Sequence, residues 1–288
     1  MTYQLYLGDR SYSSWSLRAW LLKDVWELPI ATTYVDFSGQ DVADQLAAIA
    51  PARTVPTLVT PDGAIISESL ALSEELATRF PDAGLWPADP KARAIARSLA
   101  SEMHAGFGAL REACPMNLRV AYQGVEVSSA VRADLARIDA IWSYAQAETG
   151  SETWLCGDYS IADAFYAPIA ARIATYDLPV SDASRAYVQA HLHHLPFRQW
   201  RAMGFAAGAD LPWYRRDYDR TDWPGPQPIP AKAVAEGDPV NELCPYSGDP
   251  ITHLADIDGT VIGYCNAFCR DKTVADPGAW PKTLALLP

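Results

Sequence analysis

The chain has 288 residues, of which 49% are hydrophobic and 20% are charged, a balance typical of a globular protein long enough for two compact domains. Its formal net charge of -12 argues against sequence-independent binding to nucleic acid, because such binding needs a clustered excess of Lys and Arg. We therefore expect no nucleic-acid partner and no anionic-membrane partner.

The N-terminus and the cysteine content predict where the protein works. The first residues, MTYQLYLGDR, lack the basic start and apolar core of a secretory signal, and no window approaches the roughly 20 apolar residues of a membrane span. Five cysteines are too few for a disulfide framework in a chain of this length. The sequence therefore predicts a cytoplasmic protein whose cysteines are free thiols or metal ligands.

Residues 1–81 alternate between β-rich runs and amphipathic stretches. Strands are expected at 3–7, 31–37, 57–60 and 64–66, and helices at 15–26, at 41–50 and from 67 or 68 to about 80. The sequence PDG at 61–63 is a strong turn signal, so the last two strands should form a hairpin. The order β-α-β-α-β-β-α predicts an α/β domain.

The pattern changes after the Pro-rich linker at 81–90. Residues 90–210 carry apolar side chains at three- and four-residue spacing with no convincing β run, which predicts an all-helical domain. Residues 211–240 are aromatic, charged and Pro-rich without a period, and we expect an extended connector there. Residues 241–288, which contain three of the five cysteines, are expected to form a small extension.

The first domain contains RTVPTLVTPDG from residue 53, followed by SES at 67–69. These motifs resemble the glutathione S-transferase family, whose thioredoxin-like domain carries Val-Pro before its third strand and Glu-Ser at the start of its third helix. The resemblance implies a thioredoxin-like α/β domain followed by an all-α domain, and a cis peptide bond before Pro56. It also implies a glutathione site made by Arg53, Val55, Pro56, Glu68 and Ser69.

In such a site the backbone of Val55 pairs with the cysteinyl part of glutathione, as an added strand would. Glu68 takes the γ-glutamyl ammonium, while Ser69 and the free helix N–H groups take the α-carboxylate. The alternative is that the two motifs form only the start of a strand and the cap of a helix. Their joint occurrence at this spacing favours the glutathione site.

Catalysis in this site requires a donor that stabilises the thiolate of glutathione. The loop SYSSWSLR at 11–18 resembles the serine-containing loop of the zeta and tau classes, and counting back from Arg18 makes Ser11 the match to their catalytic serine. Ser13 and Ser14 remain alternatives, although capping of the first helix is the better interpretation of both. Tyr12, where these classes usually have Pro or Ser, is a less favoured donor and a candidate pocket residue.

The resemblance places the pocket for an electrophile between the two domains. Met103, His104, Phe107 and Arg111 recur at helical spacing and are expected to line it, His104 in a structural rather than catalytic role. Further along, GDYSIAD at 157–163 resembles the capping box of the family's core helix. The histidines at 191, 193 and 194 are interpreted as a solvated helix end.

The extension contains Cys244-Pro, a turn at 258–259, a Cys265-x3-Cys269 step and a closing Asp-Pro. This resembles YHS or TRASH-type metal-binding modules, and thiolates suit Zn(II) or Cu(I). Asp249, His253 or water would supply a fourth ligand. The alternative is that the three cysteines pack as small hydrophobic residues. We favour a metal, because a unit this short has little core of its own.

These patterns together predict a glutathione S-transferase-like enzyme that activates the glutathione thiolate for attack on a small electrophile or a peroxide. The family usually forms homodimers, so the resemblance implies a homodimer here. The alternative is a non-catalytic member of the same fold that binds thiols or responds to a metal. The unusual serine loop and the added extension favour that alternative.

Overall fold

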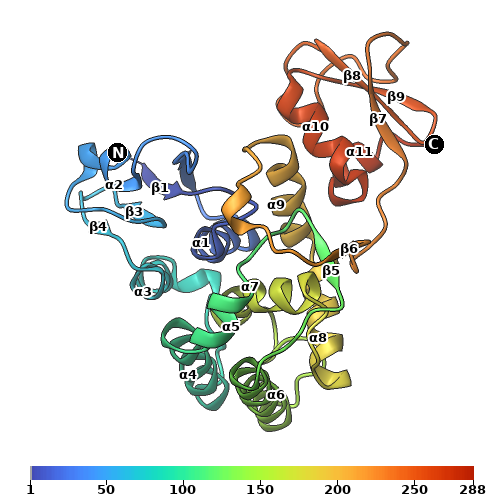
Figure 1. The fold of residues 1–288 in the computed structure, drawn as a ribbon. Helices are drawn as coiled ribbons and strands as arrows, with labels where there is room; N and C mark the ends of the chain where they lie inside the picture. Colours follow the sequence, from blue (N-terminus) through green and yellow to red (C-terminus); the bar gives the residue numbers. More distant parts are fainter. Residues whose placement is uncertain (1) are drawn as a thin grey trace.

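The computed structural model describes residues 2–288, which fold into an α/β domain, a helical domain and a small C-terminal extension (Figure 1). The elements of the first domain are β1 (Tyr3–Leu7), α1 (Ser14–Val25), β2 (Ile30–Tyr34), α2 (Val42–Gln45), β3 (Thr57–Val59), β4 (Ile65–Ile66) and α3 (Ser69–Arg79). The sheet order is β2-β1-β3-β4, with β1 parallel to β2 and antiparallel to β3. This confirms the expected order of elements, including the β3–β4 hairpin.

The first domain is built on apolar side chains that meet between the sheet and α1. Leu5 and Leu58 from the sheet and Leu17 and Leu21 from α1 are fully buried in one cluster. The second helix is shorter than expected. It covers only Val42–Gln45, followed by a 3-10 turn at 47–49, because α2 buries none of its side chains and a proline at residue 51 ends the segment.

The helical domain surrounds α7, whose residues are all buried. Its helices are α4 (Pro90–Ala105), α5 (Gly108–Ala113), α6 (Ser129–Thr149), α7 (Ile161–Thr175), α8 (Asp182–His193) and α9 (Leu195–Ala206). The capping box at the start of α7 is present, with Asp163 accepting a hydrogen bond from the N–H of Ser160 at 2.9 Å. One apolar core runs through this domain and the first domain, so the two form a single body.

The sequence predicted an all-helical second domain, but the structure also contains a strand there. A short strand, β5 (Ala121–Gln123), pairs with β6 (Asp219–Thr221) of the connector. The connector also contributes β7 (Ala231–Val234), which adds to the hairpin of β8 (His253–Ile257) and β9 (Thr260–Tyr264). The small unit therefore begins at β7, earlier than expected, because a hairpin alone leaves an unpaired edge that β7 covers.

The extension is completed by α10 (Ala267–Ala275) and α11 (Pro281–Leu284), and it docks on α9 (Figure 1). Arg198 of α9 donates two hydrogen bonds to the carboxylate of Asp276, at 2.9 and 2.7 Å. Gln199 also donates to the backbone carbonyl of Ala279. Across residues 2–288, none of the helices is long and apolar enough to cross a membrane.

Candidate functional site

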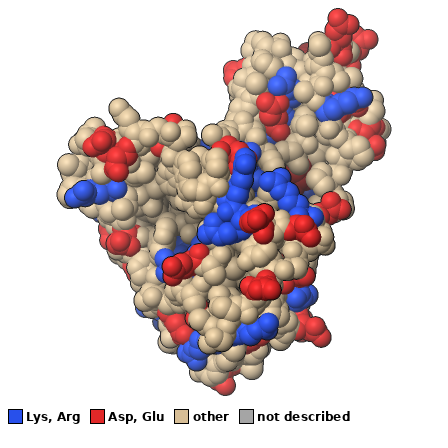
Figure 2. Space-filling view, in the orientation of Figure 1, with Lys and Arg blue, Asp and Glu red and all other residues tan. Residues whose placement is uncertain are grey.

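A cavity of about 670 Å³ lies between the first domain and the helical domain. The loop before α1, the segment before β3 and the start of α3 form one side, and α4, α5, α7 and the connector form the other. The lining residues include Tyr12, Ser13, Ser14, Trp15, Arg53, Val55, Pro56, Glu68, Ser69, His104, Arg111, Met116, Arg172 and Tyr214. Figure 2 shows the molecule hollowed between these two units on the face drawn.

All five residues expected to bind glutathione line this cavity. The Val55–Pro56 peptide bond is cis, as the resemblance implied. Ser69 is the first residue of α3 and is only 2% exposed, yet its buried Oγ finds no hydrogen-bond partner within the described residues. A buried hydroxyl without a partner is costly, so this atom is suited to a polar group that enters the cavity.

The start of α3 offers both charges that an amino acid needs. Its first N–H groups have no partner inside the helix and carry the positive end of the helix dipole, which favours a carboxylate. Glu68 precedes them as the cap residue, and its side chain is 70% exposed. Its Oε2 lies 3.6 Å from Nε2 of His104, across the cavity on α4.

The three candidate serines lie in different environments. Ser11 does not line the cavity, and its Oγ accepts a hydrogen bond from Nε of Arg119 at 3.1 Å. Ser13 lines the cavity but caps α1, accepting from the N–H of Ser16 and donating to that residue's Oγ. Ser14 also lines the cavity, and its hydroxyl makes no hydrogen bond to any residue from 2 to 288. Ser14 therefore has the hydroxyl that is free to meet a thiol.

Tyr12 lines the cavity with its hydroxyl already engaged. The hydroxyl donates to Asp210 at 2.8 Å and accepts from the N–H of Leu211, and the ring stacks on Tyr214 with centroids 4.7 Å apart. Burial and the bond to Asp210 raise the pKa of Tyr12 to about 12. These contacts tie the connector to the loop before α1, which sequence reasoning did not anticipate because the partners are some 200 residues apart.

The expected pocket residues on the helical side divide into two pairs. His104 and Arg111 line the cavity, whereas Met103 and Phe107 lie in the apolar core and not on this wall. The four residues were expected on one helix face, but they do not belong to one continuous helix. α4 ends at Ala105, and Phe107 adopts a left-handed conformation (φ 58°) before α5 begins. Burial lowers the pKa of His104, partly offset by the nearby carboxylate of Glu68.

Arg172 is a lining residue that the sequence analysis missed. It lies in the last turn of α7, is 5% exposed, and donates from Nε to the carbonyl of Cys114 at 2.9 Å. The available signal was an arginine in a helix whose other residues are almost all apolar.

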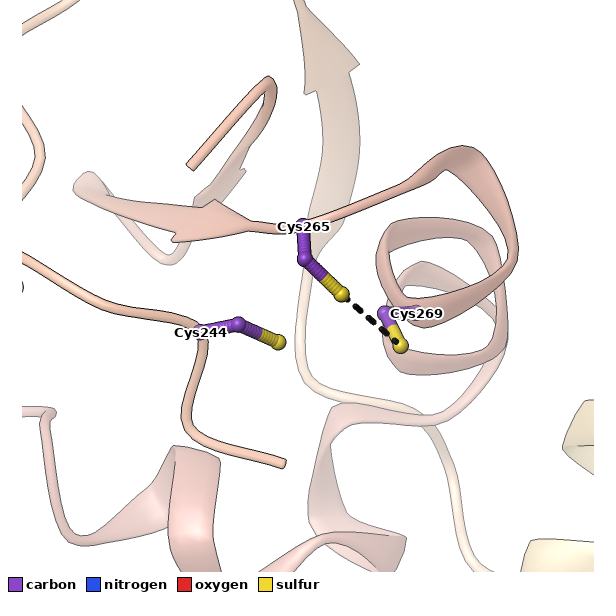
Figure 3. A group of neighbouring side chains, drawn as sticks. All are labelled: Cys244, Cys265 and Cys269. Carbon is purple, nitrogen blue, oxygen red and sulfur yellow. Dashed lines mark hydrogen bonds between the residues drawn. The ribbon is translucent and has the colours of Figure 1, made fainter. Parts of the chain in front are cut away.

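The three cysteines of the extension form a second cluster (Figure 3). Cys244 lies on a loop, Cys265 directly follows β9, and Cys269 lies on α10, and their side chains converge. The three Sγ atoms all lie within 4.8 Å of one another, and those of Cys265 and Cys269 are 3.9 Å apart. Sulfur atoms around a tetrahedral zinc are about 3.8 Å apart, given Zn–S bonds of about 2.3 Å.

Neither residue considered as a fourth ligand joins this group in the described part of the chain. Nδ1 of His253 bonds Oγ1 of Thr252, and Asp249 contributes its backbone to the turn around Cys244. Burial would raise the pKa of Cys244, but N–H groups of residues 246, 247 and 265 outweigh it and lower that pKa to about 7.

The histidines at the end of α8 are not the solvated group that we expected. His191 is fully buried, and its ring lies 5.1 Å from that of Trp154 and 4.6 Å from that of Tyr187. His194 is half-buried and packs on Tyr159 at 4.5 Å. Only His193 is exposed. Tyr187 lies on α8 itself, but Trp154 and Tyr159 come from another segment, so the pattern of α8 alone did not reveal the full aromatic surroundings.

Comparison with known proteins identifies relatives of this chain. The family model for the glutathione S-transferase N-terminal domain matches residues 12–79. A probable maleylacetoacetate isomerase of Caenorhabditis elegans is 40% identical over 104 residues, which is 36% of this chain and 47% of that protein. Maleylacetoacetate isomerase of Rattus norvegicus is 28% identical over 179 residues, 62% of this chain and 81% of that protein. The match thus spans about half of the worm protein's length.

Solved structures share the fold. A glutathione transferase homologue from Burkholderia with bound glutathione is 24% identical, has a TM-score of 0.52, and covers 71% of this chain and 98% of its own. Glutathione transferase Omega 3C from Trametes versicolor is 18% identical, has a TM-score of 0.54, and covers 70% of this chain and 88% of its own. These structures show that the chain has the glutathione transferase fold over about 70% of its length, and the family model adds a match to the N-terminal domain at residues 12–79.

Proposed function

We propose that the protein is a glutathione-dependent transferase that binds glutathione along Val55 and the start of α3 and activates its thiol. The observation that carries this proposal is the unpartnered Oγ of Ser69, buried beside the free N–H groups of α3 and next to Glu68. A γ-glutamyl group supplies the carboxylate and the ammonium that these residues suit. The glutathione-bound Burkholderia homologue supports the choice of ligand.

We assign thiol activation to Ser14. Its hydroxyl lines the cavity without a partner among the described residues, and it is the first residue of α1, where the helix dipole also favours an anion. Donation of a hydrogen bond to the sulfur stabilises the thiolate, which then attacks an electrophilic carbon or a peroxide oxygen. Where the thiolate adds to a conjugated double bond and is later eliminated, glutathione is regenerated. The relatives named as isomerases therefore suggest an isomerase reaction at the same site.

Turnover with glutathione tests this proposal. Purified protein is assayed with 1-chloro-2,4-dinitrobenzene and with cumene hydroperoxide, and Ser14→Ala is compared with Ser11→Ala. We expect activity in the wild type, a loss of about tenfold or more in kcat for Ser14→Ala, and a smaller loss for Ser11→Ala. An unchanged kcat in Ser14→Ala would contradict the assignment of thiol activation to Ser14. An equal loss in both variants would make Ser11 a candidate for that role again.

The extension supports a second proposal, a structural metal site at Cys244, Cys265 and Cys269. The donor set fits Zn(II) or Cu(I), since the three sulfur atoms all lie within 4.8 Å of one another and thiolates suit these ions. Nearby Lys272, whose Nζ lies 3.9 Å from the ring centroid of Tyr246, brings a positive charge to the thiolates. A bound ion would hold the loop, β9 and α10 together.

Metal content and stability test this second proposal. The protein is purified without chelator, and zinc and copper are measured in the wild type, in Cys265→Ser and in Cys156→Ser, whose buried cysteine lies elsewhere. About one ion per chain is expected in the wild type and in Cys156→Ser, and much less in Cys265→Ser. Metal-free wild type that also takes up no added zinc would contradict the site.

We further propose a homodimer in the cytoplasm, which light scattering and cell fractionation would check.

A further inference from the structure

The first turn of α10 joins the thiol cluster to the body of the protein. Phe268 lies in this turn, between the two cysteines of the Cys265-x3-Cys269 step. Its ring centroid is 5.5 Å from the guanidinium carbon of Arg10. Arg10 belongs to the loop before α1, whose next residues line the cavity. One residue of the cysteine step therefore contacts the loop that leads to the proposed glutathione site.

Arg10 is held by aromatic rings and not by an ion pair. Its guanidinium carbon lies 3.5 Å from the ring centroid of Tyr34, the last residue of β2. Residues 2–288 offer it no carboxylate within 4.0 Å, and its buried Nε has no hydrogen-bond partner among them. Cation–π attraction is stronger for a guanidinium that is shielded from water. The position of Arg10 therefore depends on Phe268 as well as on Tyr34.

The loop around Arg10 is a tight turn that can transmit a shift. The carboxylate of Asp9 accepts hydrogen bonds from the N–H of Ser11 at 2.7 Å and from the N–H of Tyr12 at 3.2 Å. The backbone carbonyl of Asp9 also accepts from the N–H of Ser13 at 2.9 Å. Because these bonds enclose Arg10, a displacement of its backbone is expected to move the residues that line the cavity.

Helix α9 supports both this loop and the extension. Gly204 of α9 lies so close to the loop that a Cβ there would be 2.7 Å from Oγ of Ser11 and 3.4 Å from Cβ of Arg10. Helix α10 packs along the same helix, as Figure 1 shows, and Arg198 of α9 bonds Asp276 at the end of α10. The loop and the first turn of α10 are therefore held against one rigid element.

A bound ion would fix the first turn of α10. Its three ligands come from a loop, from the end of β9 and from α10, so binding would join three segments at one point (Figure 3). Among residues 2–288, the hydrogen bond that joins two of these sulfur atoms is a weak one of 3.9 Å between Cys265 and Cys269. With both flanking cysteines bound to one ion, the ring of Phe268 would be held more firmly against Arg10.

We propose that metal binding at the three cysteines strengthens glutathione binding, because Phe268 and Arg10 transmit the ordering of α10 to the loop before α1. This inference rests on the proposed function and on the proposed metal site. A loop that is ordered before the ligand arrives loses less conformational entropy on binding, so the coupling is positive. Arg10 is a positioning residue here, since it does not line the cavity.

Calorimetry with S-hexylglutathione tests the coupling, because this analogue has no free thiol that would take the metal from the protein. The wild type is stripped with chelator and desalted, and half of it is reloaded with one equivalent of zinc. We expect zinc to lower the Kd of the analogue by about fivefold or more. By linkage, the analogue should raise the zinc affinity, measured against a chromogenic chelator, by the same factor. Stabilisation of the fold alone would leave both affinities unchanged.

Two variants break the contact from its two sides and leave the cysteines in place. In Arg10→Met and in Phe268→Leu, zinc should still bind, but the Kd of the analogue should no longer depend on zinc. The control is Arg132→Met, which removes an exposed arginine on α6 and should keep the dependence. If one variant fails to fold, the other decides. Equal Kd values with and without zinc in the wild type, or a zinc effect that survives in the variants, would overturn the coupling.

Failure of either underlying proposal gives a different result. A wild type that takes up no zinc would overturn the coupling together with the metal site. If zinc binds but the analogue binds neither form, amide hydrogen exchange at residues 9–14 is compared with and without zinc. Slower exchange with zinc, abolished in Phe268→Leu, would retain the coupling between metal and loop in a protein that does not use glutathione. Unchanged exchange would overturn it.

Discussion

The body and the extension are stabilised in different ways. In the body, one apolar core extends from Leu5 in β1 to Trp200 in α9, so the first domain and the helical domain support each other. The extension has a core of only five buried residues, one of which is Cys244. The cavity is thus formed by packing that needs no ligand, whereas the thiol cluster belongs to a unit that depends on docking and on its own sulfur atoms.

The largest effect is expected within the body at Asp163. Its carboxylate is fully buried and accepts from the N–H of Leu155 at 3.0 Å, from the N–H and Oγ of Ser160, and from the hydroxyl of Tyr187 at 2.9 Å. Asp163→Ala leaves these donors buried without an acceptor and should lower the free energy of unfolding by about 3–4 kcal/mol. Urea unfolding at pH 7.5 measures it, with the exposed Asp158→Ala as control. A loss below about 1 kcal/mol would contradict this role.

The contact between body and extension is tested next, at Arg198. Its two hydrogen bonds to Asp276 are largely shielded, with side chains 17% and 9% exposed. Arg198→Met should weaken docking by about 1.5–3 kcal/mol, seen as faster hydrogen exchange in α10 while α7 stays protected. Arg185→Met, which breaks the exposed pair with Asp177, is the matched control. Equal acceleration in α7 would show that the two regions unfold together.

Acid should destabilise the body through His194. Burial lowers its pKa to about 4, below the value of about 6.5 for an unfolded histidine, so the unfolded state takes up the proton first. The free energy of unfolding is then unaffected above pH 6.5 and falls as the pH drops from 6.5 toward 4, by about 1–2 kcal/mol at pH 5. His194→Gln should lose less stability between pH 7 and pH 5 than the wild type, and the exposed His193→Gln should not differ from it. Parallel pH curves for all three would refute the assignment.

The smallest effect separates two adjacent serines of the body. Ser13 caps α1, so Ser13→Ala should cost about 1 kcal/mol of stability in urea unfolding. Ser14 has no hydrogen-bond partner within residues 2–288, so Ser14→Ala should change stability by less than about 0.5 kcal/mol. Stability and turnover are thus expected to respond to different residues. A larger loss of stability in Ser14→Ala than in Ser13→Ala would mean that Ser14, not Ser13, caps α1.

Local signals were sufficient for most elements of the body, although α2 is shorter than expected and β5 was not expected. The turn at 61–63, the strand runs and the capping box at Asp163 each act within a few residues, and the structure confirms all of them. The thiol cluster was also accessible, because a turn and a Cys-x3-Cys step bring the sulfur atoms together over a short span.

Contacts between distant segments were not accessible. Tyr12 meets Asp210, β5 meets β6, and Arg172 reaches the cavity only because α7 packs beside α1 and α4. No periodicity in the sequence encodes such pairs. The choice among the three candidate serines also depended on a contact between distant segments, because Arg119, 108 residues away, donates a hydrogen bond to Ser11.

Glutathione binding measured by calorimetry tests the central claim most directly. The wild type, Glu68→Gln and Ser69→Ala are titrated with glutathione, and Glu152→Gln, which removes an exposed carboxylate elsewhere, is the control. We predict binding by the wild type and the control, and a loss of about tenfold or more in each of the two site variants. A wild type that does not bind glutathione, or variants that bind it as tightly as the wild type, would contradict the site.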